Sequence, residues 1–242
     1  MAILLLDLWP RSEDAESSLP GGRQNWRPME TTQDDLVRAM ITAGVTDERL
    51  IEAFRTILRD EFVPENARTL AYEDRPIAIP HDQVTTQPSL SAMMIEALDL
   101  TSSSRVLEVG TGLGFQTALL THLARKVVTI EAWEDLVEQA GSNLEAQGII
   151  NVDIRVGDCT RGVPDSAPFD GILVSAAFTE VPDPLAEQLI EGGRLVQPIG
   201  PGGNEIVTLF RRTEDSLQPI RQIIPARFVR LVGRKAFPPD MR

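Results

Sequence analysis

Two stripes of apolar residues at helical spacing mark the early part of the chain. Positions 36, 37, 40 and 41 are apolar and follow Thr32, a residue type that caps helix N-termini. Positions 50, 51, 54, 57 and 58 repeat the pattern. We predict two amphipathic helices that together form a helical cap.

From Arg105 the pattern changes to short apolar runs that alternate with helical stretches. The runs RVLEV, KVVTIE, VDIRV and DGILVSAA are typical of buried parallel strands, and GGRLVQPIG and EIVTLFRR predict two later strands. Helical spacing covers about 116–124, 133–147 and 184–190. This alternation predicts the α/β class, with a doubly wound, mostly parallel sheet of the Rossmann-like type behind the N-terminal helical cap.

Between the cap and the sheet, residues 59–89 contain several prolines and polar breaks. Prolines at this density remove backbone donors and so disfavour a long helix or a central strand. We expect an irregular surface segment, of the kind that often bears binding groups, before a helical pattern resumes at 91–98.

The length of 242 residues favours one sizeable α/β core with appendages. We predict a flexible N-terminal segment at 1–29, rich in Ser, Gly, Pro and charge, and a single domain at 30–242. Within it, 30–100 would hold the helical cap and a substrate loop, and 101–242 the ligand-binding sheet and C-terminal strands. Because Asp7 interrupts the early apolar run and no basic residue precedes it, we expect no targeting segment or membrane span.

Charge and cysteine content argue against several classes of protein. The net charge of -13 argues against a nucleic-acid partner, because binding a phosphate backbone needs clustered Lys and Arg. The single cysteine, Cys159, excludes an intrachain disulfide framework and a cysteine-rich metal site. We therefore expect a cytoplasmic protein with no bound metal and with neither membrane nor nucleic acid as a partner.

A glycine-rich turn follows the first predicted strand. It contains Gly110, Thr111, Gly112 and Gly114, which would let the backbone approach a ligand at a helix N-terminus. The dinucleotide fingerprint needs glycine where Phe115 stands, and the G-K-[ST] of a P-loop is absent. Glu108, expected at the mouth of the loop, would oppose a pyrophosphate and suit a cationic cofactor such as S-adenosylmethionine.

Acidic residues also end the next two predicted strands. Glu131, followed by Ala132, can accept hydrogen bonds from both hydroxyls of a ribose, although NAD would use the same arrangement. Asp158, followed by Cys159, is placed to accept from an adenine amino group. Each carboxylate alone could be a solvated strand-end acid, but their recurrence after three successive strands favours one ligand site at the switch point of the sheet.

Several longer stretches match the pattern of one known family. They are VLEVGTGLGFQTALL, VVTIE, GD and FDGILVSAAFTEVPDPLAEQLIEGGRLVQPIG, with FVPENARTLAYEDRPIAIPHDQVTTQPSLSAMM upstream. Together they resemble the protein-L-isoaspartate O-methyltransferase family over roughly 51–233. The resemblance implies a class I methyltransferase fold with S-adenosylmethionine as cofactor. It also implies methylation of the free carboxylate of L-isoaspartyl residues in damaged proteins or peptides, whose ester then cyclises to a succinimide.

The resemblance further implies a substrate site. Thr86 stands at the position of the family's catalytic serine and keeps the hydroxyl while adding a methyl group. Asp82, Gln83, Thr85 and Gln87 would then shape the peptide channel around it.

Near the C-terminus the chain departs from the family. The family's F-V-P-L segment reads F-V-R-L at 228–231, so Arg230 replaces a proline. Arg227 or Arg230 would attract an anionic group of a peptide, and the alternative is a solvated strand edge. Arg230 and Thr86 keep a second function open, namely methylation of a normal aspartate in a dedicated peptide to form an aspartimide.

Other chemistry-bearing residues are interpreted as structural. His81 is an ordinary surface or packing residue in this interpretation, His122 belongs to a helix, and Cys159 packs as a small residue because no base is positioned beside it. A cofactor-binding module without catalysis and a nicotinamide oxidoreductase are the remaining alternatives, and the glycine spacing disfavours the latter.

Overall fold

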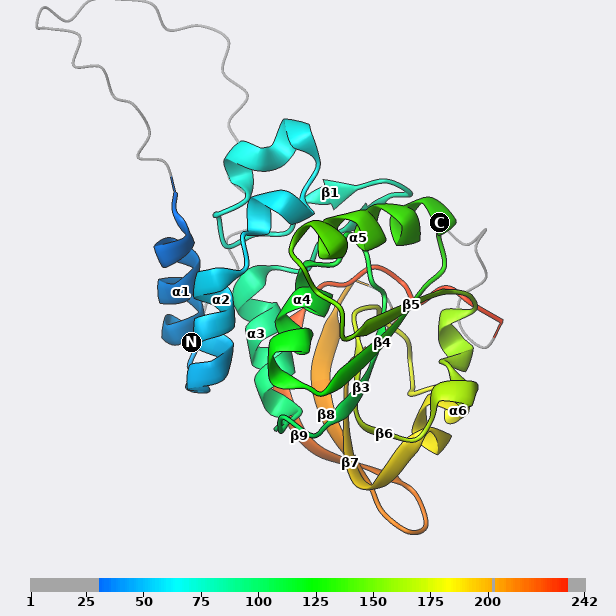
Figure 1. Cartoon of the computed structure of the whole chain (residues 1–242). Helices are drawn as coiled ribbons and strands as arrows, with labels where there is room; N and C mark the ends of the chain where they lie inside the picture. Colours follow the sequence, from blue (N-terminus) through cyan, green and yellow to red (C-terminus); the bar gives the residue numbers. More distant parts are fainter. Residues whose placement is uncertain (1–30, 202, 235–242) are drawn as a thin grey trace, which may run out of the picture. The chain divides into compact units, whose positions relative to one another are not determined.

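The computed structural model describes residues 31–201 and 203–234, so the segment predicted at 1–29 lies outside the described residues (Figure 1). The helices are α1 (Gln33–Thr42), α2 (Glu48–Thr56), α3 (Pro88–Ala97), α4 (Phe115–Leu123), α5 (Glu134–Ala146) and α6 (Asp183–Glu187). Short 3-10 helices are η1 (Arg59–Phe62), η2 (Glu65–Leu70), η3 (Cys159–Arg161) and η4 (Pro164–Ser166). The strands are β1 (Ala78–Ile79), β2 (Gln83–Val84), β3 (Arg105–Val109), β4 (Lys126–Glu131), β5 (Val152–Val156), β6 (Phe169–Val174), β7 (Leu189–Ile199), β8 (Glu205–Arg212) and β9 (Leu217–Ala226).

A seven-stranded sheet with the order β5-β4-β3-β6-β7-β8-β9 forms the centre, and β1 and β2 form a separate hairpin. The pairs from β5 to β7 are parallel, whereas β8 runs antiparallel to both β7 and β9. The chain therefore winds outward from β3 in both directions, and the switch point lies between β3 and β6. The predicted doubly wound, mostly parallel α/β fold is confirmed.

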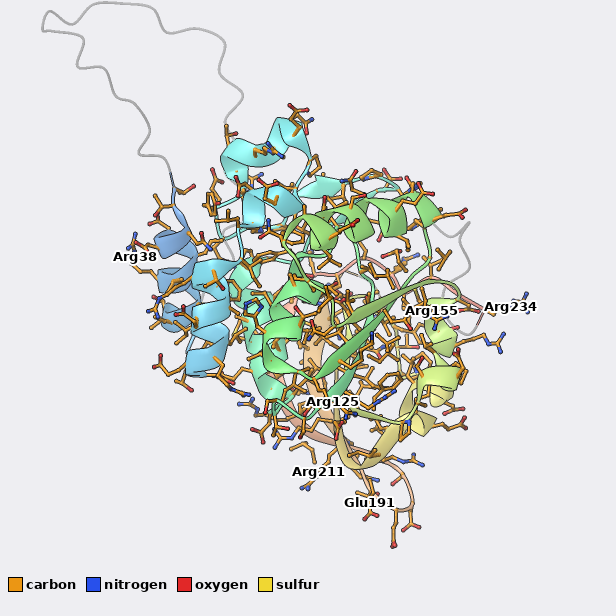
Figure 2. All side chains as sticks on the ribbon, in the orientation of Figure 1. Arg38, Arg125, Arg155, Glu191, Arg211 and Arg234 are labelled. Carbon is orange, nitrogen blue, oxygen red and sulfur yellow. The ribbon has the colours of Figure 1, made fainter. Side chains whose placement is uncertain are left out.

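Successive residues of β3 pack on opposite faces of the sheet. Val106 lies in the apolar cluster that includes α1 to α4, while Leu107 packs with α6 and the segment 159–169. Figure 1 shows α1 to α4 on one side of the sheet and α6 on the other. Because both faces are covered, the inner strands β3, β4 and β6 are mostly apolar and buried rather than alternating. Labelled charged side chains such as Arg38 and Glu191 project outward (Figure 2).

The helical cap begins close to the predicted positions. Thr32 precedes α1, and its backbone N–H donates to the Asp35 carboxylate at 2.7 Å. Asp47 caps α2 by accepting from the backbone N–H of Arg49. Both helices bury most of their apolar residues in the same cluster as α3 and α4, as Phe54 does with 1% of its surface exposed. The predicted stripe positions Ile41 and Leu58 are instead 48% and 42% exposed.

Two strands depart from the sequence pattern. The helix predicted at 184–190 is wrong in its second half, because α6 ends at Glu187 and β7 begins at Leu189. Leu189 pairs with Phe169 of β6, and this pairing outweighs the local helical spacing. The pattern also misses β9, an edge strand that contains Pro219 and Pro225, a residue type that sheets tolerate mainly at their edges.

The buried centre of β3 should dominate stability. Leu107→Ala removes a side chain with no exposed surface, and we expect it to lower the free energy of unfolding by about 2–5 kcal/mol through lost burial and a residual cavity. Ile150→Ala is the control, because Ile150 is 91% exposed and should change stability by less than about 0.5 kcal/mol. Urea unfolding followed by circular dichroism measures both, and equal effects would contradict this packing.

Candidate functional site

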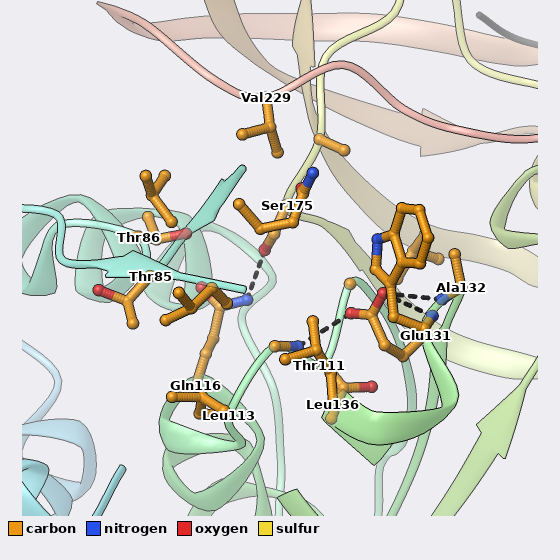
Figure 3. Close-up of a pocket in the computed structure, with 18 of the residues that line it drawn as sticks. Thr85, Thr86, Thr111, Leu113, Gln116, Glu131, Ala132, Leu136, Ser175 and Val229 are labelled. Atoms are coloured by element: carbon orange, nitrogen blue, oxygen red, sulfur yellow. Dashed lines mark hydrogen bonds between the residues drawn. The ribbon is translucent and has the colours of Figure 1, made fainter. Parts of the chain in front are cut away.

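A cavity opens at the carboxyl ends of β3, β4 and β6. Figure 3 places Thr85 and Thr86 on one side of it and Glu131 and Ala132 on the other. The predicted site residues that line it are Gln83, Thr85, Thr86, Gly110, Thr111, Gly112, Glu131, Ala132, Cys159 and Arg230. The predicted residues outside the lining are Asp82, Gln87, Glu108, Gly114 and Asp158.

Backbone geometry explains the glycines of the loop after β3. Gly110 and Gly112 have φ angles of 96° and 55°, a left-handed conformation that other residues rarely adopt. Gly114 has a φ of 95° and precedes α4. A Cβ atom there would meet Leu144 of α5 at 3.3 Å, so Gly114 permits close packing of two helices instead of facing the cavity.

Glu131 is held in a fixed orientation at the end of β4. Its Oε2 accepts from the backbone N–H of Gly112 at 3.0 Å, and its Oε1 accepts from the N–H of Ala132 at 2.7 Å. The side chain is 7% exposed and lines the cavity. The backbone N–H of Trp133 donates a third, longer bond to Oε1 at 3.4 Å. Since a carboxylate has about four acceptor positions, about one remains for a ligand.

Glu108 is not at the mouth of the loop, which corrects the prediction. Its side chain has no exposed surface and accepts from the hydroxyls of Thr117 and Thr129 and from the amide of Gln116 at 2.5, 2.8 and 3.2 Å. Burial raises the pKa of Glu108 to about 7, and these hydrogen bonds oppose the rise. The sequence pattern could not show that the strand end turns this side chain beneath the loop.

Gln116 and Ser175 are cavity residues that the sequence analysis missed. The Gln116 amide nitrogen donates to Ser175 Oγ at 2.6 Å, and both side chains line the cavity. Figure 3 shows this bond between the threonine side and the Glu131 side. The sequence feature that could have indicated Gln116 is a polar amide in the first turn of the helix that follows the glycine loop.

A buried arginine organises the irregular segment at 59–89. The Arg59 side chain is 1% exposed, and its guanidinium donates to the carbonyl oxygens of Ala71, Glu73 and Arg75 at 2.8–2.9 Å. A fourth bond, 3.1 Å long, reaches Thr85 Oγ1. Burial lowers the pKa of Arg59 to about 10, so the group stays charged at neutral pH.

The loop after β2 presents one hydroxyl to the cavity. Thr86 lines it, and its side chain has no hydrogen-bond partner within residues 31–201 and 203–234. Gln87 differs from the predicted substrate contact, because its amide donates to the Asp74 carboxylate at 2.9 Å and to Ser89 Oγ at 3.1 Å. Thr85 and Gln87 therefore hold the loop, and Thr86 is left facing the cavity.

The β1–β2 hairpin is attached to the start of α5. The His81 ring stacks on Trp133 with 4.1 Å between ring centroids, and its Nε2 lies 2.8 Å from Asp135 Oδ1. His81 and Asp82 both have left-handed φ angles, 63° and 56°, in the connecting turn. This agrees with the packing interpretation of His81 and leaves Asp82 outside the cavity lining.

The C-terminal segment closes another side of the cavity. It is fixed by backbone bonds, since the N–H of Ala177 donates to the carbonyl of Val229 at 2.7 Å and the N–H of Leu231 donates back to Ala177 at 2.8 Å. Arg230 lies between them and lines the cavity. Asp158 faces this segment instead of the cavity, because its Oδ2 accepts from the backbone N–H of Arg234 at 3.1 Å.

The family model described as Protein-L-isoaspartate(D-aspartate) O-methyltransferase (PCMT) matches residues 31–236. The matched range contains every residue of the cavity lining. The chain belongs to this family.

Relatives of the family are similar over most of the chain. The protein-L-isoaspartate O-methyltransferase of Roseiflexus sp. (strain RS-1) is 43% identical over 202 residues, which cover 84% of this chain and 92% of that protein. The enzyme of the same name from Methanoculleus marisnigri is 45% identical over 187 residues, covering 76% and 85%. A solved protein-L-isoaspartate O-methyltransferase superposes with a TM-score of 0.75 at 30% identity, covering 85% of this chain and 67% of the other. The structure of the Plasmodium falciparum PCMT shares the fold, with a TM-score of 0.70 at 21% identity over 84% of this chain and 99% of that one.

The cavity lining contains few charged side chains. Among the described lining residues, Glu131 and Arg230 are the charged ones; Glu131 ends β4 and Arg230 lies in the C-terminal segment after β9. Cys159 also lines the cavity, and burial raises the pKa of its thiol, so it is neutral at physiological pH. None of the described residues forms a helix long and apolar enough to cross a membrane.

The buried Glu108 should make stability depend on pH. Folding raises its pKa from 4.5 to about 7, so the ionised form is disfavoured in the folded state. The resulting penalty is absent below the unfolded value, grows as the pH rises, and is complete above about 7. The free energy of unfolding of Glu108→Gln, relative to that of wild type, should therefore rise between pH 5 and pH 8 by an amount on the order of 3 kcal/mol.

Chemical denaturation of the ligand-free protein at both pH values measures this difference. Glu191→Gln is the matched control, because it makes the same change at an exposed position and should show no such gain. A Glu108→Gln difference that is the same at both pH values would contradict the raised pKa.

Proposed function

We propose that the chain transfers a methyl group from S-adenosylmethionine to the free carboxylate of L-isoaspartyl residues in proteins or peptides. The proposal rests on one cavity that brings the fixed carboxylate of Glu131 and the hydroxyl of Thr86 together, in a chain of the protein-L-isoaspartate O-methyltransferase family. The relatives' shared name supplies the class of acceptor. The methyl ester then cyclises to a succinimide, which leads to repair.

The residues on the Glu131 side fit S-adenosylmethionine. Glu131 has an acceptor position left for a ribose hydroxyl, and Gly110 and Gly112 let the backbone come close to a ligand. Cys159 offers a neutral, weakly polar surface for packing against a base. When bound, the cofactor supplies a methyl group activated by a sulfonium.

The acceptor needs no general base. A carboxylate with a pKa near 4 is already ionised at pH 7, and the described lining residues include no histidine. The protein's task is to orient the carboxylate and to exclude water from it. Thr86 donates a hydrogen bond that aims the carboxylate, and apolar lining residues such as Phe62 and Val229 exclude water.

The peptide side of the site is assigned to Thr86, Gln83 and Arg230. Arg230 is the lining cation and attracts the additional carboxylate that an isoaspartyl linkage exposes. Proteins and peptides are thus the partners, and a cytoplasmic location, supported by the single buried cysteine, belongs to the same proposal.

The role of Thr86 is tested by two substitutions. Thr86→Ser keeps the hydroxyl and should stay active. Thr86→Val keeps the shape but removes a hydrogen bond to a charged group, worth roughly 1.5–3 kcal/mol, so kcat/KM for the peptide should fall about 10- to 150-fold. The affinity for S-adenosylhomocysteine, measured by calorimetry, should not change. A valine variant with wild-type kcat/KM would rule out the aiming hydrogen bond, and a loss confined to cofactor binding would move Thr86 to the cofactor side.

Substrate choice is tested with two versions of one peptide, one with an L-isoaspartyl residue and one with the normal aspartyl residue. We expect base-labile methyl ester on the isoaspartyl peptide and little on its twin. The opposite preference would instead favour aspartimide formation, which the replacement of a proline by Arg230 keeps as the second candidate. Absence of ester on both peptides, with binding of S-adenosylhomocysteine intact, would contradict the proposed acceptor class.

A further inference from the structure

The side-chain oxygen of Gln116 lacks a hydrogen-bond partner among the described residues. The residue is 8% exposed and lies in the first turn of α4. Its amide nitrogen donates to Glu108 Oε1 at 3.2 Å and to Ser175 Oγ at 2.6 Å. Its buried Oε1 has no hydrogen-bond partner among the described residues. A buried acceptor of this kind is costly unless something pairs with it.

Glu108 fixes which way the amide points. While Glu108 is ionised, which is its main form above the raised pKa of about 7, rotating the Gln116 amide by half a turn would place the amide oxygen against Glu108 Oε1, and two acceptors would then face each other. The nitrogen is therefore held toward Glu108 and Ser175. Gln116 lines the cavity with its amide nitrogen directed at Ser175 (Figure 3), so a donor for the buried oxygen would have to enter with a ligand bound there.

The charges around the amide favour a cationic donor. Glu108 contacts the Gln116 amide from the side away from the cavity lining. Glu131 is the acidic residue of the described cavity lining, and its negative charge also acts on Glu108. Thr117 and Thr129, the other groups that contact Glu108, are neutral. An ammonium group gains from this negative environment, whereas a neutral peptide N–H gains much less.

We propose that Gln116, oriented by Glu108 and Ser175, binds the α-ammonium group of S-adenosylmethionine and of its product S-adenosylhomocysteine. This inference rests on the proposed cofactor. It assigns Gln116 as a binding residue and Glu108 and Ser175 as residues that position its amide. It also gives a use to the buried carboxylate of Glu108, which the methyl transfer itself does not need.

The test compares two ligands on two proteins. The ligands are S-adenosylhomocysteine and its analogue in which hydrogen replaces the α-amino group, and calorimetry measures both dissociation constants. Gln116→Met keeps the length of the side chain and removes the acceptor. We expect it to weaken S-adenosylhomocysteine about 10- to 150-fold and to leave the affinity for the deaminated analogue unchanged.

Gln197→Met is the matched control. Gln197 is also a fully buried glutamine with an unpartnered Oε1, but it lies outside the cavity lining, and its amide donates to the carbonyl of Glu180 at 3.1 Å. The affinity of this variant for S-adenosylhomocysteine should equal that of wild type. If Gln116→Met does not fold, Ser175→Ala provides the second test, because it removes one of the two acceptors that orient the amide without changing the charge, and it should weaken S-adenosylhomocysteine more than the analogue.

Other results overturn the inference. Equal losses for both ligands would show that Gln116 acts without contacting the ammonium group. A higher KM for the peptide with unchanged S-adenosylhomocysteine affinity would show that the oxygen pairs with the substrate. If wild type binds neither ligand, the proposed cofactor fails, and that outcome is distinct from failure of the Gln116 contact alone.

Discussion

Backbone hydrogen bonds that continue past the ends of the parallel strands determine where the site can form. The N–H of Gly110 donates to Ile130, that of Ser175 donates to Val109, and each of these bonds is 2.9 Å long. The loops after β3 and β6 are therefore fixed to their neighbours at the switch point. Because backbone pairing continues beyond the strand ends, it fixes the glycine loop, Glu131 and Ser175 around one cavity.

A different kind of interaction holds the opposite side of the cavity. Residues 71–85 contain no long helix or strand. The guanidinium of Arg59 holds this segment together by donating hydrogen bonds to three carbonyl oxygens and to Thr85 Oγ1. A planar group with five donors is well suited to gather separate backbone acceptors. Phe115 lies beneath it, with its ring centroid 5.8 Å from the guanidinium carbon, so the clamp also packs against the start of α4. The site thus joins a rigid sheet edge to a segment whose order depends on one side chain.

The sequence predicted the sheet, the glycine loop and the position of Glu131 because each has a local signature. Burial of Glu108 was not predictable, since the pattern places an acid at a strand end without showing which way its side chain turns. Arg59 lies in a segment whose prolines indicated only irregular structure, and its four acceptors are 12 to 26 positions away in the chain. Asp158 is turned by a local cap on Thr160 together with a bond from Arg234, which is distant in sequence. Long-range contacts of this kind leave no periodic trace.

The edge strand β9 has a consequence for how the molecule meets other copies of itself. An open sheet edge exposes backbone donors and acceptors that can recruit a strand from another chain and start aggregation. Pro219 and Pro225, which lie opposite Phe210 and Ile206 of β8, each lack an N–H, and prolines on an edge strand disfavour pairing with a further strand. The outer rim of β9 is thereby a poor template for a further strand. At the other edge, β5 carries Asp153 and Arg155, joined at 2.8 Å, and burying this ion pair under an added strand would cost its hydration. Both ends of the sheet are thus protected against growth by the residues that terminate it.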